Sequence, residues 1–189
     1  MWVLSLVAVV VLVVGVVVIA GSSSGSDEQS LVGPEGTITV PASENPKTQD
    51  DLWDPNNVPD SAVAAVGGDP TSRSCNFYEN SKGCSWGART ATGAEYSLFV
   101  WMSTSSFDEV RQRKDNVDQV MTTVGGKDAV RYHDRGRSYA DDCYVTWGTS
   151  FGSTWIEVRA EDYGNVEESP DIPRLCAEWA DQIHSVAPH

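Results

Sequence analysis

The first twenty residues, Met1 to Ala20, contain no charged side chain. An apolar run of about 20 residues is long enough to cross the roughly 30 Å hydrocarbon core of a bilayer as a helix. The run has no polar stripe, which disfavours a helix packed against a soluble core. Signal peptides begin with positively charged residues, and no lysine or arginine precedes this run. We therefore expect residues 1–21 to form a retained transmembrane helix.

The competing interpretation is a signal peptide that is cleaved after Ala20, because Val18 and Ala20 suit a signal peptidase. Cleavage would leave a secreted protein. No basic residue occurs before Lys47, so nothing favours a cytosolic position for the carboxyl-terminal side of the run. We expect a single-pass protein of the cell membrane with its folded part on the extracytoplasmic side.

Hydrophobic residues are scarce between residues 22 and 60, where Ser, Gly, Pro, Asn and acidic residues dominate and Lys47 is the only basic residue. Such a segment buries too little apolar surface to offset the entropy lost on ordering. We expect a disordered acidic linker over residues 22–51, followed by one domain over 52–189. A calcium site made by acidic residues of this block is the alternative, but their spacing is not that of an EF-hand: Asp50, Asp51, Asp54 and Asp60.

Several common catalytic motifs are missing from the chain. It has no H-E-x-x-H, G-x-x-x-x-G-K or G-x-G-x-x-G segment, and no C-x2-C pair for zinc or C-x-x-C redox pair. We expect no enzyme activity, no catalytic residues, no metal and no cofactor.

Histidines and neighbouring acidic residues offer little further chemistry. The histidines, His133, His184 and His189, are interpreted as surface residues. The adjacent acidic pairs, Asp141-Asp142 and Glu161-Asp162, are interpreted as solvated charges in turns.

Basic residues are also few, with 13 Lys and Arg against 27 Asp and Glu and a sequence pI near 4.4. Phosphate backbones require a broad positive surface, so nucleic acid is excluded as a partner.

Residues 52–189 show the patterns of antiparallel strands with inserted and appended helices. Strands are expected at 84–89, 96–102, 119–124, 129–133, 143–147 and 154–160. Helices are expected at 61–66 with Asp60 as its cap, from Ser105 or Ser106 to about 116, and after an Asp171 cap. The order predicts an α+β fold, in which one face of an antiparallel β-sheet is covered by helices as a two-layer sandwich.

Four cysteines allow three disulfide pairings, and spacing alone does not choose between them. Cys75 and Cys84 bracket a polar segment that can fold back on itself. Cys143 lies on the expected inner face of a strand, and Cys176 lies on the apolar stripe of the last helix. We therefore predict the disulfides Cys75–Cys84 and Cys143–Cys176.

Most tryptophans are interpreted as core residues. Phe77, Tyr78 and Trp86 lie near the first predicted disulfide and are a candidate exposed aromatic patch for a ligand or partner.

Short segments along the domain carry a resemblance to a known family: Asp54-Pro55, Val58-Pro59-Asp60-Ser61-Ala62-Val63, Gly67-Gly68-Asp69-Pro70, Cys84-Ser85-Trp86, Phe107-Asp108-Glu109-Val110, Val124-Gly125-Gly126-Lys127-Asp128-Ala129, Cys143-Tyr144-Val145 and the helix start at 173–177. From Leu52 to its end, the chain resembles the actinobacterial envelope proteins grouped as domain of unknown function 3558 (DUF3558). The resemblance implies a location in the cell envelope and no established activity.

The chain departs from that family at two points. Members commonly are lipoproteins with a cysteine at the end of the signal peptide, where this chain has Ser22. The family also tends to have a cysteine just after Asp54-Pro55, where this chain has Asn56 and carries Cys75 instead. If the displaced cysteine keeps its partner, the resemblance supports the pairing of Cys75 with Cys84.

These observations lead to a membrane-tethered extracytoplasmic domain that binds without catalysis, as a protein-interaction module of the cell envelope. The alternative function is a lipid or glycolipid carrier, which would need an apolar cavity between the sheet and the helices.

Overall fold

The computed structural model describes residues 31–33, 36–38, 48–138, 141–161 and 169–188. The chain divides into two compact units, Met1–Ala42 and Ser43–His189. In the first unit, β1 (Leu31–Gly33) pairs antiparallel with β2 (Gly36–Ile38). Both strands lie within the segment predicted as a disordered linker, and that prediction stays a prediction.

The expected membrane helix at 1–21 lies outside the described residues. Within the described ranges, no helix combines the length and the apolar character that crossing a bilayer requires.

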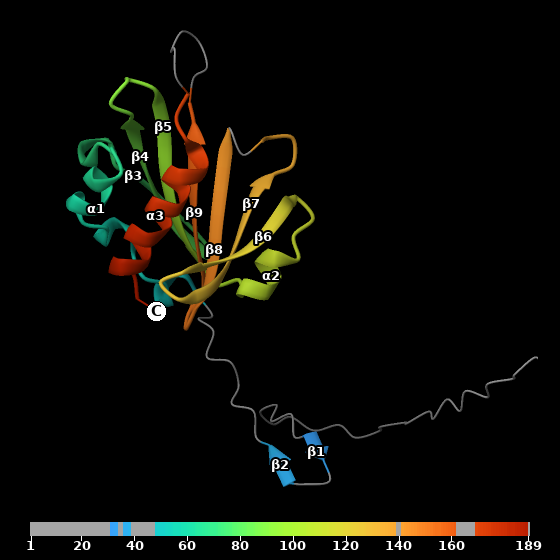
Figure 1. The fold of residues 1–189 in the computed structure, drawn as a ribbon. Coiled ribbons are helices and arrows are strands. Elements are labelled where there is room, and N and C mark those ends of the chain that lie inside the picture. Colours follow the sequence, from blue (N-terminus) through green and yellow to red (C-terminus); the bar gives the residue numbers. More distant parts are fainter. Residues whose placement is uncertain (1–30, 34–35, 39–47, 139–140, 162–168, 189) are drawn as a thin grey trace, which may run out of the picture. The chain divides into compact units, whose positions relative to one another are not determined.

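The second unit is built on one antiparallel sheet of seven strands, with the spatial order β3-β4-β5-β9-β8-β7-β6 (Figure 1). The strands are β3 (Ser74–Tyr78), β4 (Ser81–Arg89), β5 (Glu95–Ser103), β6 (Asn116–Val124), β7 (Lys127–Asp134), β8 (Asp142–Thr149) and β9 (Gly152–Ala160). The predicted α+β class and the antiparallel sheet are confirmed. β3 was not predicted from the sequence, because most of its residues are polar or exposed and show no apolar alternation.

The helices are η1 (Gln49–Asp51), η2 (Pro55–Asn57), α1 (Asp60–Ala65), η3 (Pro70–Ser72), α2 (Phe107–Arg111) and α3 (Ile172–Val186). α3 packs on β8 and β9, and Figure 1 shows it lying across the sheet. The Asp171 carboxylate accepts a hydrogen bond from the backbone N–H of Arg174, which confirms the predicted cap of this helix.

Two helices differ in detail from the prediction. α1 has Pro59 at its N-cap, and Asp60 does not cap it because its carboxylate pairs with Arg73 at 2.7 Å. α2 has the predicted capping box of Ser106 and Glu109 but ends at Arg111. The chain then turns into β6, and the Asn116 amide holds the Val110 carbonyl at 2.9 Å.

The core lies between α3 and the sheet face that β5 lines with Leu98, Val100 and Met102, each fully buried. We call this the inner face. Trp86, Trp147 and Trp179 fill the space, each at most 1% exposed. The Trp179 ring donates its N–H to the carbonyl of Phe99 at 2.8 Å and meets the Trp86 ring edge to face. Such a pairing adds about 0.5–1.5 kcal/mol to the burial itself.

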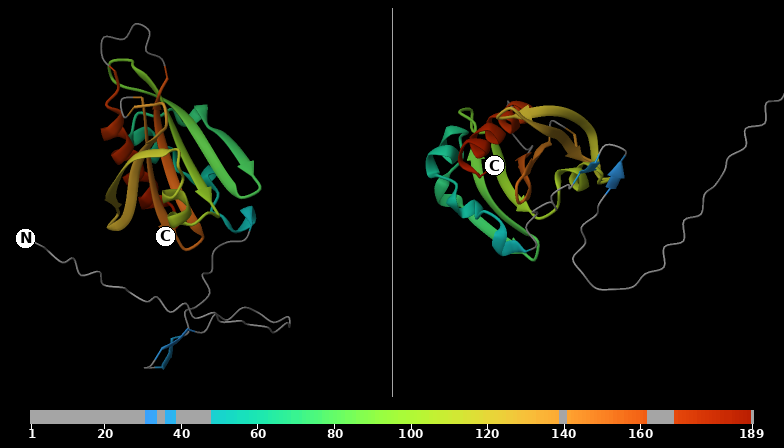
Figure 2. Two further views of the ribbon diagram at one scale, coloured as in Figure 1. Left: turned by 90° about the vertical axis from the view of Figure 1, so that its right-hand side faces the viewer. Right: turned by 90° about the horizontal axis from the view of Figure 1, so that it is seen from below.

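Helices lie on both faces of the sheet. Side chains alternate along β8, so Gly148 belongs to the face opposite that of Cys143, Val145 and Trp147. A Cβ at Gly148 would touch Phe107 at 3.4 Å, which places α2 on this opposite face, named the outer face below. Figure 2 shows the curved sheet with α2 and α3 on different sides. The structure differs here from the prediction, which placed helices on one face only.

Both predicted disulfides are present. Cys143 on β8 is bonded to Cys176 on α3, which fastens the helix to the centre of the sheet. Cys75 and Cys84 are directly opposite each other on β3 and β4, with their Cα atoms 4.1 Å apart.

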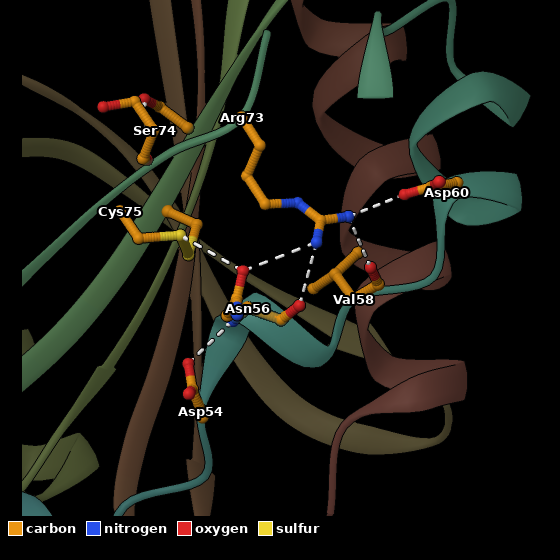
Figure 3. Close-up of a disulfide and its surroundings, with 9 residues drawn as sticks. Asp54, Asn56, Val58, Asp60, Arg73, Ser74 and Cys75 are labelled. Carbon is orange, nitrogen blue, oxygen red and sulfur yellow. Dashed lines mark hydrogen bonds and ion pairs between the residues drawn. A yellow bond between two sulfur atoms is a disulfide. The ribbon is translucent and has the colours of Figure 1, made fainter. Parts of the chain in front are cut away.

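Arg73 ties the chain before α1 to the start of β3 (Figure 3). Its guanidinium donates to the carbonyls of Asn56 and Val58 and to the Asp60 carboxylate, at 3.0, 3.1 and 2.7 Å. It also lies over the Trp86 ring at 5.7 Å from the ring centre. The Asn56 side-chain oxygen is thereby held 3.9 Å from the Cys75 sulfur.

This proximity predicts that the first disulfide can be relocated. In the double variant Asn56→Cys with Cys75→Ser, we expect a bond between the introduced thiol at position 56 and Cys84. It should recover about 2–4 kcal/mol of the unfolding free energy lost in Cys75→Ser alone. Mass spectrometry of an unreduced digest and urea unfolding provide the measurements.

The matched control is Asn57→Cys with Cys75→Ser, since Asn57 is an exposed neighbour. A free thiol at position 56, or equal bonding from position 57, would contradict the prediction.

Candidate functional site

Five aromatic side chains stand next to one another across the outer face of the sheet. We call this set the aromatic row, and it consists of Tyr78, Trp101, Trp155, Tyr144 and Tyr132. Successive ring centres in this order are 5.7, 5.3, 6.0 and 5.2 Å apart. Two of these contacts join residues that are directly paired, Trp101 with Trp155 and Tyr132 with Tyr144. Aromatic cross-strand pairs of this kind stabilise a sheet by about 0.2–1 kcal/mol each.

The row passes over β4 because that strand has glycine at the crossing point. Gly83 is paired with Trp101, and a Cβ at Gly83 would come within 2.3 Å of the indole. The Trp101 ring covers the backbone of β4 at Gly83 and stacks on Tyr78 of β3, the next strand of the sheet. Gly83 is therefore the residue that connects the edge strand to the rest of the row.

The row is buried at one end and open at the other. Tyr132 is 4% exposed, whereas Tyr78 is 56% exposed. Three of the four ring contacts are nearly parallel, with planes 6–25° apart, so the inner rings cover one another's faces. Trp101, Trp155 and Tyr144 are half-buried, and Tyr78 at the edge of the sheet is the most exposed ring of the row.

The predicted aromatic patch is present only in part. Phe77 and Tyr78 are 52% and 56% exposed on the edge strand β3, and we call these two residues the edge patch. Trp86 does not belong to it, so the prediction was wrong for this residue. Trp86 is paired with Leu98 of β5, which places its ring on the inner face at 1% exposure.

Exposed large hydrophobic side chains occur at both edges of the sheet. In the described part of the chain they are Phe77 and Tyr78 on β3, and Val120 and Met121 on β6. At each edge the two residues are neighbours in sequence, so they project to opposite faces of the strand.

Next to the aromatic row lie carboxylates that sequence reasoning did not place there. Asp142 is fully buried and Glu157 is 5% exposed. Arg137 and Arg159 pair with them at 3.6 and 3.4 Å. The prediction of a solvated turn was wrong for Asp142, because β8 begins at this residue and pairs it with Arg159 of β9.

Burial has the largest effect on the pKa values of Asp142, Glu157, Tyr144 and Tyr132. Loss of water raises the pKa of Asp142 to about 6, although Arg137 opposes the change. The pKa of Glu157 is also raised by burial, and Arg159 opposes it. Tyr144 donates a hydrogen bond to Asp134 at 3.1 Å, and burial raises the pKa of its hydroxyl. Burial likewise raises the pKa of Tyr132 to about 12, so neither hydroxyl is activated as a nucleophile.

His133 is also buried, at 6% exposure, so its interpretation as a surface residue was wrong. β6 is irregular between Val117 and Val120, and Asp118 there has a positive φ of 51°. This irregularity brings the Asp118 carboxylate within 2.8 Å of the His133 ring. Burial lowers the pKa of His133, but hydrogen bonds to Asp118 and to the Asp134 carbonyl outweigh it and raise the pKa overall.

A groove of about 580 Å³ lies at the end of β4 and β5. Its lining includes the Arg89–Glu95 ion pair together with Asp69 and Glu161. The groove is open and its lining is mixed polar and apolar, so it lacks the enclosed apolar walls that hold small organic ligands. Within the described ranges, no group of three or more His, Cys, Asp and Glu side chains is arranged to hold a metal ion.

Comparison with known proteins gives one match. The model of a family described as "Protein of unknown function (DUF3558)" matches residues 17–183. No curated protein and no solved structure matches the chain.

The position of Gly83 predicts how the aromatic row responds to a single methyl group. In Gly83→Ala the new Cβ displaces the Trp101 ring, so we expect a loss of about 1–3 kcal/mol of unfolding free energy. The matched control is Gly87→Ala on the same strand and face, where the nearest atom would lie 3.7 Å from the Cβ. Urea unfolding followed by tryptophan fluorescence measures both. Equal losses in the two variants would contradict the role assigned to Gly83.

The buried Asp142 predicts a pH dependence of stability. Its pKa is higher in the folded than in the unfolded chain, so the ionised form opposes folding above about pH 6. This cost falls as the pH drops towards 3.8, the ordinary value. We expect Asp142→Asn to be more stable than the wild type at pH 7 by about 1–3 kcal/mol, and the two to converge near pH 4.

Urea unfolding between pH 4 and pH 8 measures this difference, with exposed Asp128→Asn as the control. A constant difference between wild type and Asp142→Asn across that range would show that Asp142 does not titrate as described.

Proposed function

We propose that this protein, which belongs to the DUF3558 family, is a non-catalytic protein-interaction module of the cell envelope. Residues 1–21 anchor it in the membrane as a transmembrane helix, residues 22–51 act as an acidic spacer, and residues 52–189 form the binding domain outside the cytoplasm. The observation that carries the proposal is the edge patch, two large aromatic side chains more than half exposed on an open edge strand.

The edge patch is presented on a rigid support. β3 is covalently joined to β4 by Cys75–Cys84, and Arg73 fixes its start to the segment before α1. Tyr78 stacks on Trp101, so its ring is held in place before any partner arrives. Preorganisation of this kind lowers the entropy lost on binding, and aromatic residues are enriched at protein interfaces.

The chemistry of the described residues supports binding over catalysis. The two tyrosine hydroxyls next to the buried carboxylates have raised pKa values and are poor nucleophiles. Asp142 and Glu157 are each paired with an arginine, and both are buried, at 0% and 5% exposure. A substrate would need access to at least one such group.

Packing on the inner face favours an interaction module over a lipid carrier. A carrier requires an apolar cavity between sheet and helices. In this protein the indoles of Trp86, Trp147 and Trp179 occupy the space between the sheet and α3, each at most 1% exposed. The exposed aromatic surface is at the sheet edge, where a protein surface can reach it.

Photo-crosslinking in intact cells tests the proposal on the full chain. With a photoreactive amino acid in place of Phe77, we expect a discrete crosslinked protein species at least about fivefold more abundant than from Asp181, an exposed residue of α3. Replacing Tyr78 with Ser in the same chain should reduce the yield from position 77. Equal yields from positions 77 and 181 would refute the edge patch as the binding surface.

A further inference from the structure

β3 is an edge strand whose open side has no strand partner in the described part of the chain. We propose that a second copy of this protein pairs antiparallel with β3, which joins the two sheets edge to edge around a two-fold axis. This inference rests on the proposed function, since it names the partner of the edge patch.

The backbone of β3 is oriented for such pairing. The Cα atoms of Cys75 and Cys84 are 4.1 Å apart, which is the spacing of a non-hydrogen-bonded pair in an antiparallel sheet. Because such pairs alternate with hydrogen-bonded ones, Phe77 and Lys82 form another non-hydrogen-bonded pair. The N–H and C=O groups of Cys75 and Phe77 therefore point away from β4, towards the open edge.

In one register these backbone groups form hydrogen bonds between the copies and the side chains of β3 also pack against each other. A two-fold axis through Asn76 places Cys75 of each copy opposite Phe77 of the other, so about four backbone hydrogen bonds form between the copies. On the same face, each Phe77 ring then covers the half-buried disulfide of the other copy. Two apolar surfaces that are accessible to water in the single chain become buried.

The charges next to β3 fit the same register. Arg73 precedes the strand and Glu79 follows it, so pairing around Asn76 brings Glu79 of one copy opposite Arg73 of the other. The Arg73 guanidinium keeps its ion pair with Asp60, and Glu79 of the other copy adds a second carboxylate near it. Shifting the axis by one residue in either direction places Arg73 opposite Phe77, or Glu79 opposite Cys75. Opposite charges are paired at both ends only when the axis passes through Asn76. This charge complementarity favours a second copy of this chain as the partner.

The other edge of the sheet lacks this fit. β6 is irregular between Val117 and Val120, and Asp118 has positive φ and places a charge within the strand. Bulges and charges are common devices that prevent an edge strand from pairing. β3 contains no bulge, proline or charged residue over Ser74–Tyr78.

Cysteine crosslinking in intact cells tests the register on the full chain. In Asn76→Cys the two introduced thiols face each other across the axis, at a Cα separation of about 4.5–5.5 Å that a disulfide can span. In Ser74→Cys, on the same strand and face, the thiols are about 13 Å apart. We expect at least about tenfold more covalent dimer from position 76 than from position 74 on a non-reducing gel.

The mass of the full chain in detergent micelles, measured by light scattering, gives a second readout. The wild type should be a dimer, Phe77→Lys a monomer, and Val120→Lys on the other edge still a dimer. A monomeric wild type, or equal crosslinking from positions 74 and 76, would overturn the inference.

The failure of this inference is distinguishable from that of the proposed function. If the wild type is monomeric while photo-crosslinking from position 77 captures a different protein, the edge patch is a binding surface but its partner is not a second copy. If position 77 captures nothing and the wild type is monomeric, both proposals fall.

Discussion

The bond between Cys143 and Cys176 joins the middle of the sheet to α3, and the two sheet faces acquire different roles from this attachment. The face beneath α3 is filled by indoles and aliphatic side chains and forms the core. The opposite face contacts the short helix α2 and carries stacked rings and partly compensated charges. Because side chains alternate along each strand, every residue of β5, β8 and β9 is assigned to one of these roles by its position alone.

Much of the fold could be predicted from the sequence. The apolar stripe containing Cys176 and Trp179 predicted α3, and the alternation around Gly125-Gly126 and after Cys143 predicted two hairpins, all of which are confirmed. The disulfide pairing followed from the same patterns. β3 could not be predicted because an edge strand exposed on both faces has no apolar alternation.

The candidate site was less accessible to sequence reasoning. Phe77 and Tyr78 were identified from their composition and position, but Trp86 is three residues from the end of a strand whose alternation decides its face, and that register is set by pairing with β5. The buried state of Asp142 and His133 depends on residues distant in sequence, Arg159 and Asp118 among them. Local patterns of charge do not record such contacts, which arise only when the strands pair.

The fastening of the chain at the start of the domain has a mechanical consequence. Lys82 of β4 donates to the Leu52 carbonyl at 2.9 Å, and Gln49 donates to the Ser81 carbonyl. Tension applied to the backbone ahead of Thr48 is therefore transmitted first to the β3–β4 hairpin. The Cys75–Cys84 crosslink prevents those two strands from sliding or peeling apart, so the load passes into the interior of the sheet while the hairpin keeps its shape.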